Sequence, residues 1–261
     1  MDTLQGVTFA LTGTVEPPTV PATLADLFSH YQLSVHVVAD SEFLTILFDA
    51  THPKIGDSQT ALQAGLWANF PTFSPLALER VMRQDYLWQA DCFECFIAKD
   101  SQADSPYLEV NLATNGEFNL YYFDSYRTPN ALPPRRLPTT ALTYGKDINF
   151  FSQAITQDTE LPLVFWHSAS PMLFTHVRAV EQQYAFSACT FRVGMTFAKS
   201  ALDKLVGANG SYALNPTRVI QQQLDSNVTD VSDSTITEMR YWAIQHANPA
   251  DFHNKTYWIN A

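Results

Sequence analysis

Three closely spaced segments of this 261-residue chain alternate polar and apolar side chains, and their polar sets could do chemistry. Successive side chains on an extended strand point to opposite faces, so each set would share one face. A plain solvent face would favour Lys, Thr and Ser, whereas these sets offer carboxylates, amides and phenols, the groups that bind sugar hydroxyls. In chain order the sets are Cys92, Glu94 and Phe96; Tyr107, Glu109 and Asn111; and Glu117, Asn119 and Tyr121.

These polar side chains indicate a candidate ligand-binding face. If the segments pair as an antiparallel meander, carboxylates and amides line one face of a sheet and can bind vicinal hydroxyls in pairs. Aromatic rings nearby could stack on the apolar face of a pyranose. The alternative is a buried, internally satisfied polar pair, or simply the wet face of the sheet. The candidate polar residues are Glu94, Glu109, Asn111 and Asn119, and the candidate aromatic residues are Trp88, Tyr107, Tyr121 and Trp242.

A second candidate site lies near the end of the chain, where His246, Asp251 and His253 follow one another closely. Two imidazoles and a carboxylate are a common open metal site, which would suit a metal-assisted hydrolase. A further imidazole could come from His167 or His176. In the alternative, His246 bonds the backbone at a strand end and Asp251 caps the turn. We favour ligand contact or loop stapling over metal binding, and we predict no cofactor.

Arg127 follows the third alternating segment and can form a forked contact with a carboxylate. Because its surroundings are acidic, an internal ion pair with Asp124, Asp91 or Glu94 is favoured over a contact with a ligand.

Catalysis is the main alternative to binding. A glycosidase needs two carboxyl groups about the scissile bond, and Glu94 and Glu109 on neighbouring strands could supply them. The chain holds no GxSxG, Walker-type, GxGxxG or HExxH signature. We therefore favour a non-catalytic binding module.

β-Strands are the elements that must position these residues. The segments 91–97, 107–112 and 117–123 predict the meander, and an aromatic content of 13% favours strands over helices. A polar stretch rich in Asn, Gln and Ser, 198–235, is predicted to be a surface insertion. We predict that 1–261 form one all-β domain, an immunoglobulin-like or jelly-roll sandwich with long decorated loops. Further strands are predicted at 7–11, 33–38, 42–48, 161–167, 172–180, 184–190, 192–197, 239–244 and 256–259, and short helices at 23–30, 60–67 and 75–83.

Two motifs resemble a known family. The sequence LWQADCFECFI followed by YLEVNLATNGEFNLYYFDSYR, and later YWAIQHANPADFH, resemble the bacterial DOMON-like proteins related to family-9 carbohydrate-binding modules. The resemblance implies a β-sandwich that binds carbohydrate or another small polar ligand without catalysis. A haem-binding DOMON relative is a second alternative, which would need a Met/His or His/His axial pair. The matching positions are Leu87, Trp88, Cys92, Phe93, Glu94, Phe96, Ile97, Tyr107, Glu109, Asn111, Gly116, Tyr122, Phe123, Tyr126, Arg127, Tyr241, Trp242, Ala243, His246, Asp251, Phe252 and His253.

Composition and charge exclude several classes of partner. The formal net charge of −11 argues against nucleic acid, because nothing here could neutralise several phosphates, and it disfavours an anionic membrane surface. No apolar run approaches the ~18 residues of a membrane span. A small molecule or saccharide is therefore the expected partner, and the oligomeric state stays open.

The chain's beginning and its cysteines predict a cytoplasmic protein. No Lys or Arg precedes Lys54 and no apolar h-region is present, so no secretory signal is predicted. A secreted form from which the signal has been removed is the alternative. Cys92 and Cys95 form a CxxC, but this spacing on one strand places them on opposite faces. We therefore predict buried, reduced thiols instead of a redox or zinc site.

Overall fold

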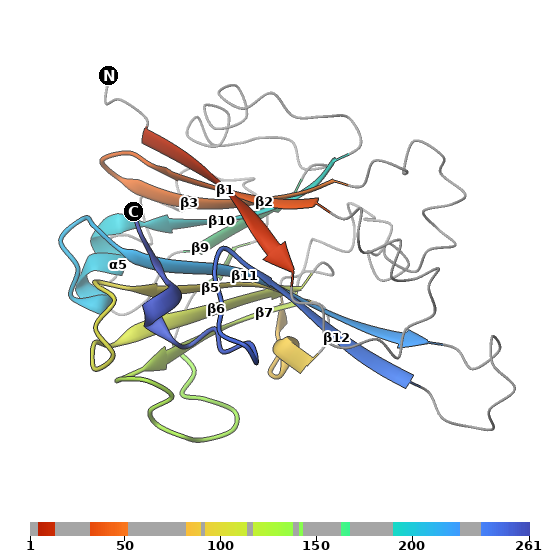
Figure 1. The fold of residues 1–261 in the computed structure, drawn as a ribbon. Helices are drawn as coiled ribbons and strands as arrows, with labels where there is room; N and C mark the ends of the chain where they lie inside the picture. The colour runs from red at the N-terminus through yellow and green to blue at the C-terminus, as the bar shows by residue number, and fades with distance from the viewer. Residues whose placement is uncertain are drawn as a thin grey trace, which may run out of the picture.

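The computed structural model describes residues 5–13, 32–51, 82–89, 92–113, 117–137, 141–142, 163–167, 190–224 and 236–261. These residues form two mostly antiparallel sheets, an all-β sandwich (Figure 1). The first sheet has the order β1 (Gln5–Gly13), β2 (Gln32–Ala39), β3 (Phe43–Thr51), β10 (Thr190–Ala198), β9 (Leu163–His167), β8 (Ala141–Leu142). The second has the order β4 (Met82–Arg83), β7 (Glu117–Phe123), β6 (Tyr107–Ala113), β5 (Cys92–Ala98), β11 (Ala213–Leu224), β12 (Ile236–Ala243), with β13 (Ile259–Asn260) beside β11.

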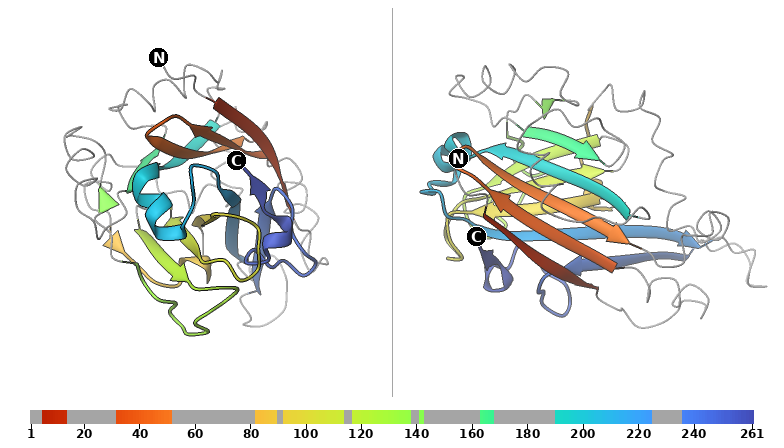
Figure 2. Two further views of the ribbon diagram at one scale, coloured as in Figure 1. Left: turned by 90° about the vertical axis from the view of Figure 1, so that its left-hand side faces the viewer. Right: turned by 90° about the horizontal axis from the view of Figure 1, so that it is seen from above.

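Strand β1 joins the two sheets. Along most of its length it pairs with β2, while its end pairs with β12 through Thr12↔Ala243 and Gly13↔Trp242. The end-on view in Figure 2 shows the two layers with β1 running along one side. Short helical elements complete the described part: η2 (Leu87–Gln89), α5 (Lys199–Val206) and η4 (Lys255–Tyr257). No helix in these ranges is long and apolar enough to cross a membrane.

The core between the sheets is built from the apolar alternate residues that the sequence predicts. On β5, Phe93, Cys95 and Ile97 face the other sheet, and the Phe93 ring lies 5.0 Å from that of Phe48 on β3. Burying such side chains stabilises the fold by about 1.5–3 kcal/mol each. The inner face of β5 is therefore part of this core.

The outer face of the second sheet carries a second buried cluster, which includes Cys92, Phe96, Tyr107, Phe252 and Trp258. The segment after β12 covers this cluster, so the residues on both faces of β5 are buried. Cys92 and Cys95 are buried free thiols on opposite faces of this strand, as predicted.

The predicted surface insertion over 198–235 is wrong for residues 213–224. They form β11, a strand between β5 and β12 in the middle of the second sheet. Residues 199–206 form α5, and 225–235 lie outside the described residues. The strand includes the polar run Gln221–Gln223, a composition that is typical of a surface segment. Its place in the sheet depends on pairing with β12, which a local sequence pattern does not show.

Most other predicted strands agree with the structure. The strand predicted at 256–259 is wrong over most of its length, because η4 occupies 255–257. Of the helix predicted at 75–83, residues 82–83 form the strand β4 instead, and 75–81 lie outside the described residues. The helices predicted at 23–30 and 60–67 and the strands at 172–180 and 184–189 lie outside the described residues.

Candidate functional site

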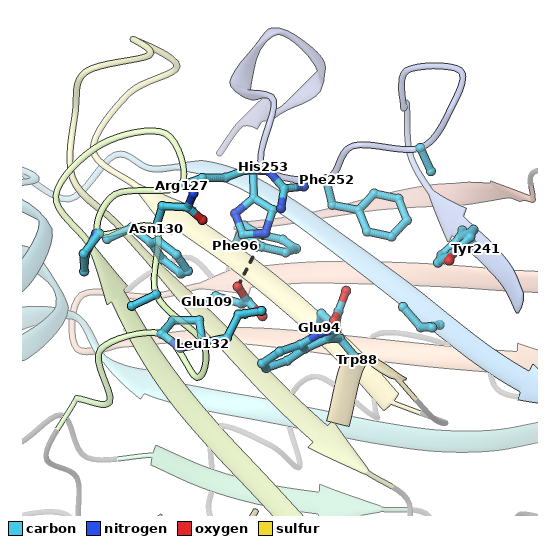
Figure 3. Close-up of a pocket in the computed structure, with 16 residues that line it drawn as sticks. Trp88, Glu94, Phe96, Glu109, Arg127, Asn130, Leu132, Tyr241, Phe252 and His253 are labelled. Atoms are coloured by element: carbon cyan, nitrogen blue, oxygen red, sulfur yellow. Dashed lines mark ion pairs between the residues drawn. The ribbon is translucent and has the colours of Figure 1, made fainter. Parts of the chain in front are cut away.

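A pocket of about 240 Å³ lies on the outer face of the second sheet (Figure 3). Its floor comes from β5 and β6, and its walls come from η2, β7, β12, the loop after β7 and the segment after β12. The lining residues are Trp88, Glu94, Phe96, Glu109, Phe123, Arg127, Pro129, Asn130, Ala131, Leu132, Pro134, Val219, Tyr241, Ala250, Phe252 and His253.

Two carboxyl groups form the polar floor. In the antiparallel register Glu94 lies opposite Asn111, and Phe96 lies opposite Glu109, so the two glutamates are diagonal neighbours on one face. Their exposed fractions are only 2% and 4%. The predicted meander register, and the shared face of Glu94, Glu109 and Asn111, are confirmed.

Each glutamate side chain accepts few hydrogen bonds from the described residues. The Thr217 hydroxyl donates to Glu94 Oε2 at 2.9 Å, and the Cys92 thiol contacts Oε1 at 3.6 Å. The Asn111 amide donates to Glu109 Oε1 at 2.9 Å. Burial raises the pKa of Glu94 to about 7, and burial together with the charge of Glu94 raises the pKa of Glu109 to about 8. The pair therefore retains protons near neutral pH.

A hydrogen-bond chain orients His253 above this floor. The backbone N–H of Arg127 donates to the Tyr107 hydroxyl oxygen at 3.2 Å, and that hydroxyl lies 2.7 Å from His253 Nδ1. With its oxygen already accepting, the phenol is free to donate to Nδ1, which places the imidazole proton on Nε2. Nε2 lies 3.8 Å from Glu109 Oε2. Burial lowers the pKa of His253 to about 3, so the ring is neutral.

The rim carries an ion pair that differs from the one predicted. Arg127 donates to Asp251 Oδ1 at 2.9 Å, and the Tyr126 hydroxyl donates to Asp251 Oδ2 at 2.7 Å. Burial of Asp251 opposes its ionisation, but these two hydrogen bonds and the charge of Arg127 hold its pKa below the usual value. The predicted partner Asp124 instead pairs with Arg135. The prediction of an internal partner is confirmed, but its identity is wrong because Asp251 is distant in the sequence.

Aromatic and apolar side chains form the walls. Trp88 on η2 rests edge-on against Tyr121, with ring centroids 5.5 Å apart. On the opposite side the Tyr241 and Phe252 rings lie 5.8 Å apart. Leu132, on the loop after β7, is 74% exposed at the rim, an apolar surface that a ligand could cover.

The structure brings five of the predicted site residues into the lining: Trp88, Glu94, Glu109, Arg127 and His253. Others support it from outside. Tyr107 and Asn111 bond His253 and Glu109, and Asn119 and Tyr121 both donate to Asp85 Oδ1, at 2.7 and 2.9 Å. Asp85 in turn pairs with Arg136.

Trp242 is wrongly predicted as a stacking residue. It packs in the core between the sheets, and its neighbour Tyr241 lines the pocket instead. Its place on the inner face follows from pairing with Arg218, whereas Tyr241 pairs with Val219 on the outer face. Sequence reasoning also missed the ring of Phe123, which shares the polar face of β7, and that of Phe252.

The predicted metal constellation is not assembled. His246 lies outside the lining, with Nδ1 2.8 Å from the Ala247 carbonyl oxygen, and Asp251 is bound at the rim. Within the described ranges no three His, Cys, Asp or Glu residues are grouped to hold a metal ion. The lining contains one His and no Met, so the described residues supply no axial pair for haem there. His167 is on β9 of the other sheet, and His176 lies outside the described residues.

Comparisons with known proteins leave the family open. No family model matches the chain, and no curated protein matches it at a meaningful level. A solved structure of a proposed carbohydrate-binding protein from Bacteroides uniformis ATCC 8492 aligns over 90% of this chain and 79% of that chain. The sequence identity is 11% and the TM-score is 0.43. The resemblance to DOMON-like proteins therefore stays a prediction.

Proposed function

We propose that this chain is a non-catalytic binding module for a small saccharide, which it holds in the pocket above Glu94 and Glu109. One observation carries the proposal: two buried carboxyl groups form the floor of a pocket whose walls are aromatic. Ligand sites typically combine apolar walls with a few convergent polar groups in this way.

The chemistry of the floor suits hydroxyl groups. Carboxyl groups that retain protons near neutral pH both donate and accept hydrogen bonds, as vicinal hydroxyls do. The rings of Trp88 and Tyr241 offer surfaces for the C–H face of a pyranose. A volume of about 240 Å³ is below the usual range of about 300–1,000 Å³ for drug-sized ligands. The pocket therefore suits a single sugar ring.

The DOMON-like character is part of the same proposal. The first motif supplies Trp88, Glu94, Glu109 and Arg127 to the pocket, and the second supplies His253. Two motifs more than a hundred positions apart in the sequence thus contribute to one pocket, which supports reading them as parts of one binding site.

A glycan array with thermal melting of matched variants tests the proposal. The protein is expected to bind a defined set of glycans. Glu109→Gln is expected to weaken binding at least tenfold, because a pair that holds one proton keeps one charged carboxylate, and a hydrogen bond to a charged group contributes about 1.5–3 kcal/mol. Glu42→Gln is the charge-matched control, since Glu42 is exposed at the β2–β3 turn of the other sheet. Silence of the folded wild-type protein on the array would refute the proposal.

A glycosidase is the second candidate, favoured by the raised pKa values of Glu94 and Glu109. A pair that holds one proton has the acid and the carboxylate that glycoside cleavage needs. The two side chains, however, lie side by side on neighbouring strands at one floor. Release of nitrophenol from chromogenic glycosides, lost in Glu94→Gln and in Glu109→Gln but not in Glu42→Gln, would favour this candidate.

A further inference from the structure

The charges around the pocket do not balance within the described residues. Arg127 is the one guanidinium in the lining, and its charge is already paired with Asp251 at 2.9 Å. Glu109 lies near His253, but that imidazole is neutral because burial lowers its pKa to about 3. The charge of Arg127 also lowers the pKa of Glu109, but burial outweighs it, so in the described lining Glu109 has no ion-paired cation beyond the one that Asp251 already neutralises.

Glu94 is compensated only across the sheet. Arg218 is fully buried on the inner face, where its guanidinium lies 4.1 Å from the centroid of the Phe93 ring and donates to the Val219 carbonyl oxygen at 2.7 Å. Its positive charge lowers the pKa of Glu94, although burial dominates and the net shift is upward. With Arg218 offsetting Glu94 and Asp251 offsetting Arg127, the site lacks one positive charge.

Both carboxyl groups also have unused acceptor positions. A carboxylate offers about four lone-pair sites. Among the described residues Glu109 Oε2 accepts no hydrogen bond and lies 3.8 Å from His253 Nε2, and Glu94 Oε1 receives only the thiol at 3.6 Å. Figure 3 shows both carboxyl groups pointing into the pocket. A group with several N–H donors would satisfy these positions, whereas a quaternary ammonium has none to offer.

The walls favour a cation as well. The negative faces of Trp and Tyr rings attract cations within about 6 Å, by 0.5–1 kcal/mol where exposed and by roughly 2 kcal/mol where desolvated. Trp88, Phe96, Phe123 and Tyr241 all line the pocket. An ammonium group enclosed by such rings loses less on leaving water than it would in an aliphatic pocket.

We infer that the saccharide bound here is an amino sugar with a free primary ammonium group, which lies between Glu94 and Glu109 while the carbon face of the ring rests on the aromatic wall. This inference rests on the proposed saccharide function and specifies its ligand class. The ammonium supplies the missing positive charge and the N–H donors, and it takes the place of the proton that the acid pair holds in the empty pocket.

Ligand-detected NMR at pH 7 with three matched pairs tests the inference: D-glucosamine with D-glucose, D-galactosamine with D-galactose, and D-mannosamine with D-mannose. In at least one pair the amino sugar is expected to bind at least tenfold more tightly than its parent. The N-acetylated sugar keeps the substituent's position but loses its charge, so it is expected to bind like the parent. Choline, a cation without N–H donors, is expected not to compete.

The ratio of the affinity for the amino sugar to the affinity for its parent sugar, measured for each protein variant, separates loss of the ammonium contact from a general weakening of sugar binding. It is expected to fall to near one in Glu109→Gln and in Glu94→Gln, and to stay at the wild-type value in Glu42→Gln. Equal affinity for amine and parent in every pair would overturn the inference and leave the proposed function standing. Absence of binding by all six sugars would overturn the inference, and silence on the glycan array as well would overturn the proposed function. A preference that persists in both pocket variants, or equal competition by choline, would overturn the inference alone.

Discussion

Raising the pH from 6.5 to 8 is expected to destabilise the wild-type protein, and to do so through Glu94 and Glu109. Burial raises the pKa of these groups to about 7 and about 8. In the unfolded chain a glutamate has a pKa near 4.3. The folded state therefore binds more protons than the unfolded state above about pH 4.3, so stability falls as the pH rises, and the loss is complete only once the pH has passed through 7 to 8.

Two other buried groups change the free energy of unfolding in the opposite direction, mainly outside the range from pH 6.5 to 8. Burial lowers the pKa of His253 to about 3, so its contribution is complete above about pH 6.5 and is lost only as the pH falls below that. Burial lowers the pKa of Lys255 to about 8, so the folded state begins to bind fewer protons than the unfolded state as the pH approaches 8, which partly opposes the loss at the upper end of this range. Between pH 6.5 and 8 the buried acid pair is therefore expected to set the slope.

The size of the effect follows from the proton count. Each extra proton held by the folded state changes the free energy of unfolding by about 1.4 kcal/mol per pH unit. If the pair holds on average about one extra proton across 1.5 pH units, the loss is about 2 kcal/mol. Domains are stabilised by only about 5–15 kcal/mol in total, so a change of this size is readily measured.

Urea denaturation at constant ionic strength, followed by tryptophan fluorescence at pH 6.5, 7, 7.5 and 8, measures this loss. The variant Glu94→Gln/Glu109→Gln lacks both carboxyl groups and is expected to lose much less stability than the wild type over this range. Glu42→Gln is expected to keep the wild-type slope. The reasoning would be refuted by a flat wild-type profile, or by a double variant that loses stability as steeply as the wild type.

Four further predictions concern single residues. Trp242→Ala removes an inter-sheet core residue and is expected to lower the free energy of unfolding in urea by about 3–5 kcal/mol. Trp88→Ala is expected to cost less stability but to abolish saccharide binding on the array, because Trp88 is only partly buried and lines the pocket. Tyr107→Phe removes the hydroxyl beside His253 Nδ1 and is expected to move the imidazole proton toward Nδ1, as ¹⁵N NMR would show. The Cys95 thiol, fully buried and with its pKa raised by burial, is expected to react with Ellman's reagent only on unfolding.

The polar floor could be predicted from the sequence because alternation is a local property. In 92–98 and 107–113 the side chains that share a face can be read directly from the period of two, once an antiparallel meander is assumed. The structure bears out that register, with Glu94 opposite Asn111 and Phe96 opposite Glu109. These residues needed no information from distant parts of the chain.

Two neighbouring aromatic residues, Tyr241 and Trp242, show where local reasoning fails. In the pair Tyr241-Trp242 either ring could face the pocket, because a shift of one residue exchanges the two faces of a strand. Pairing with β11 decides which of the two rings faces the pocket. The polar composition of β11 had led to its prediction as a surface insertion. The partner of Arg127 was missed for a similar reason, since Asp251 reaches it only after the chain has passed through β10, β11 and β12.

The position of β11 also explains how distant motifs form one site. Across the second sheet, Ala243, Thr217, Glu94 and Asn111 occupy one row of paired positions, so the end of β12 is level with the pocket floor. The following segment then turns back over the sheet. Its return is fixed where the Phe252 carbonyl oxygen accepts hydrogen bonds from Asn215 at 3.0 Å and from the Trp258 indole at 2.9 Å.

That fixed return places the His253 ring 5.0 Å from the ring of Phe96, directly above the acid pair. A strand buried on both faces would ordinarily be apolar throughout, because an unpaired buried charge is costly. β5 instead carries Glu94 on its covered face, and β6 carries Glu109 beside it. The described residues give Glu94 and Glu109 few hydrogen bonds, so much of the cost of burying these carboxyl groups is not offset. A bound group with N–H and O–H donors would therefore stabilise this face more than an apolar bound group would.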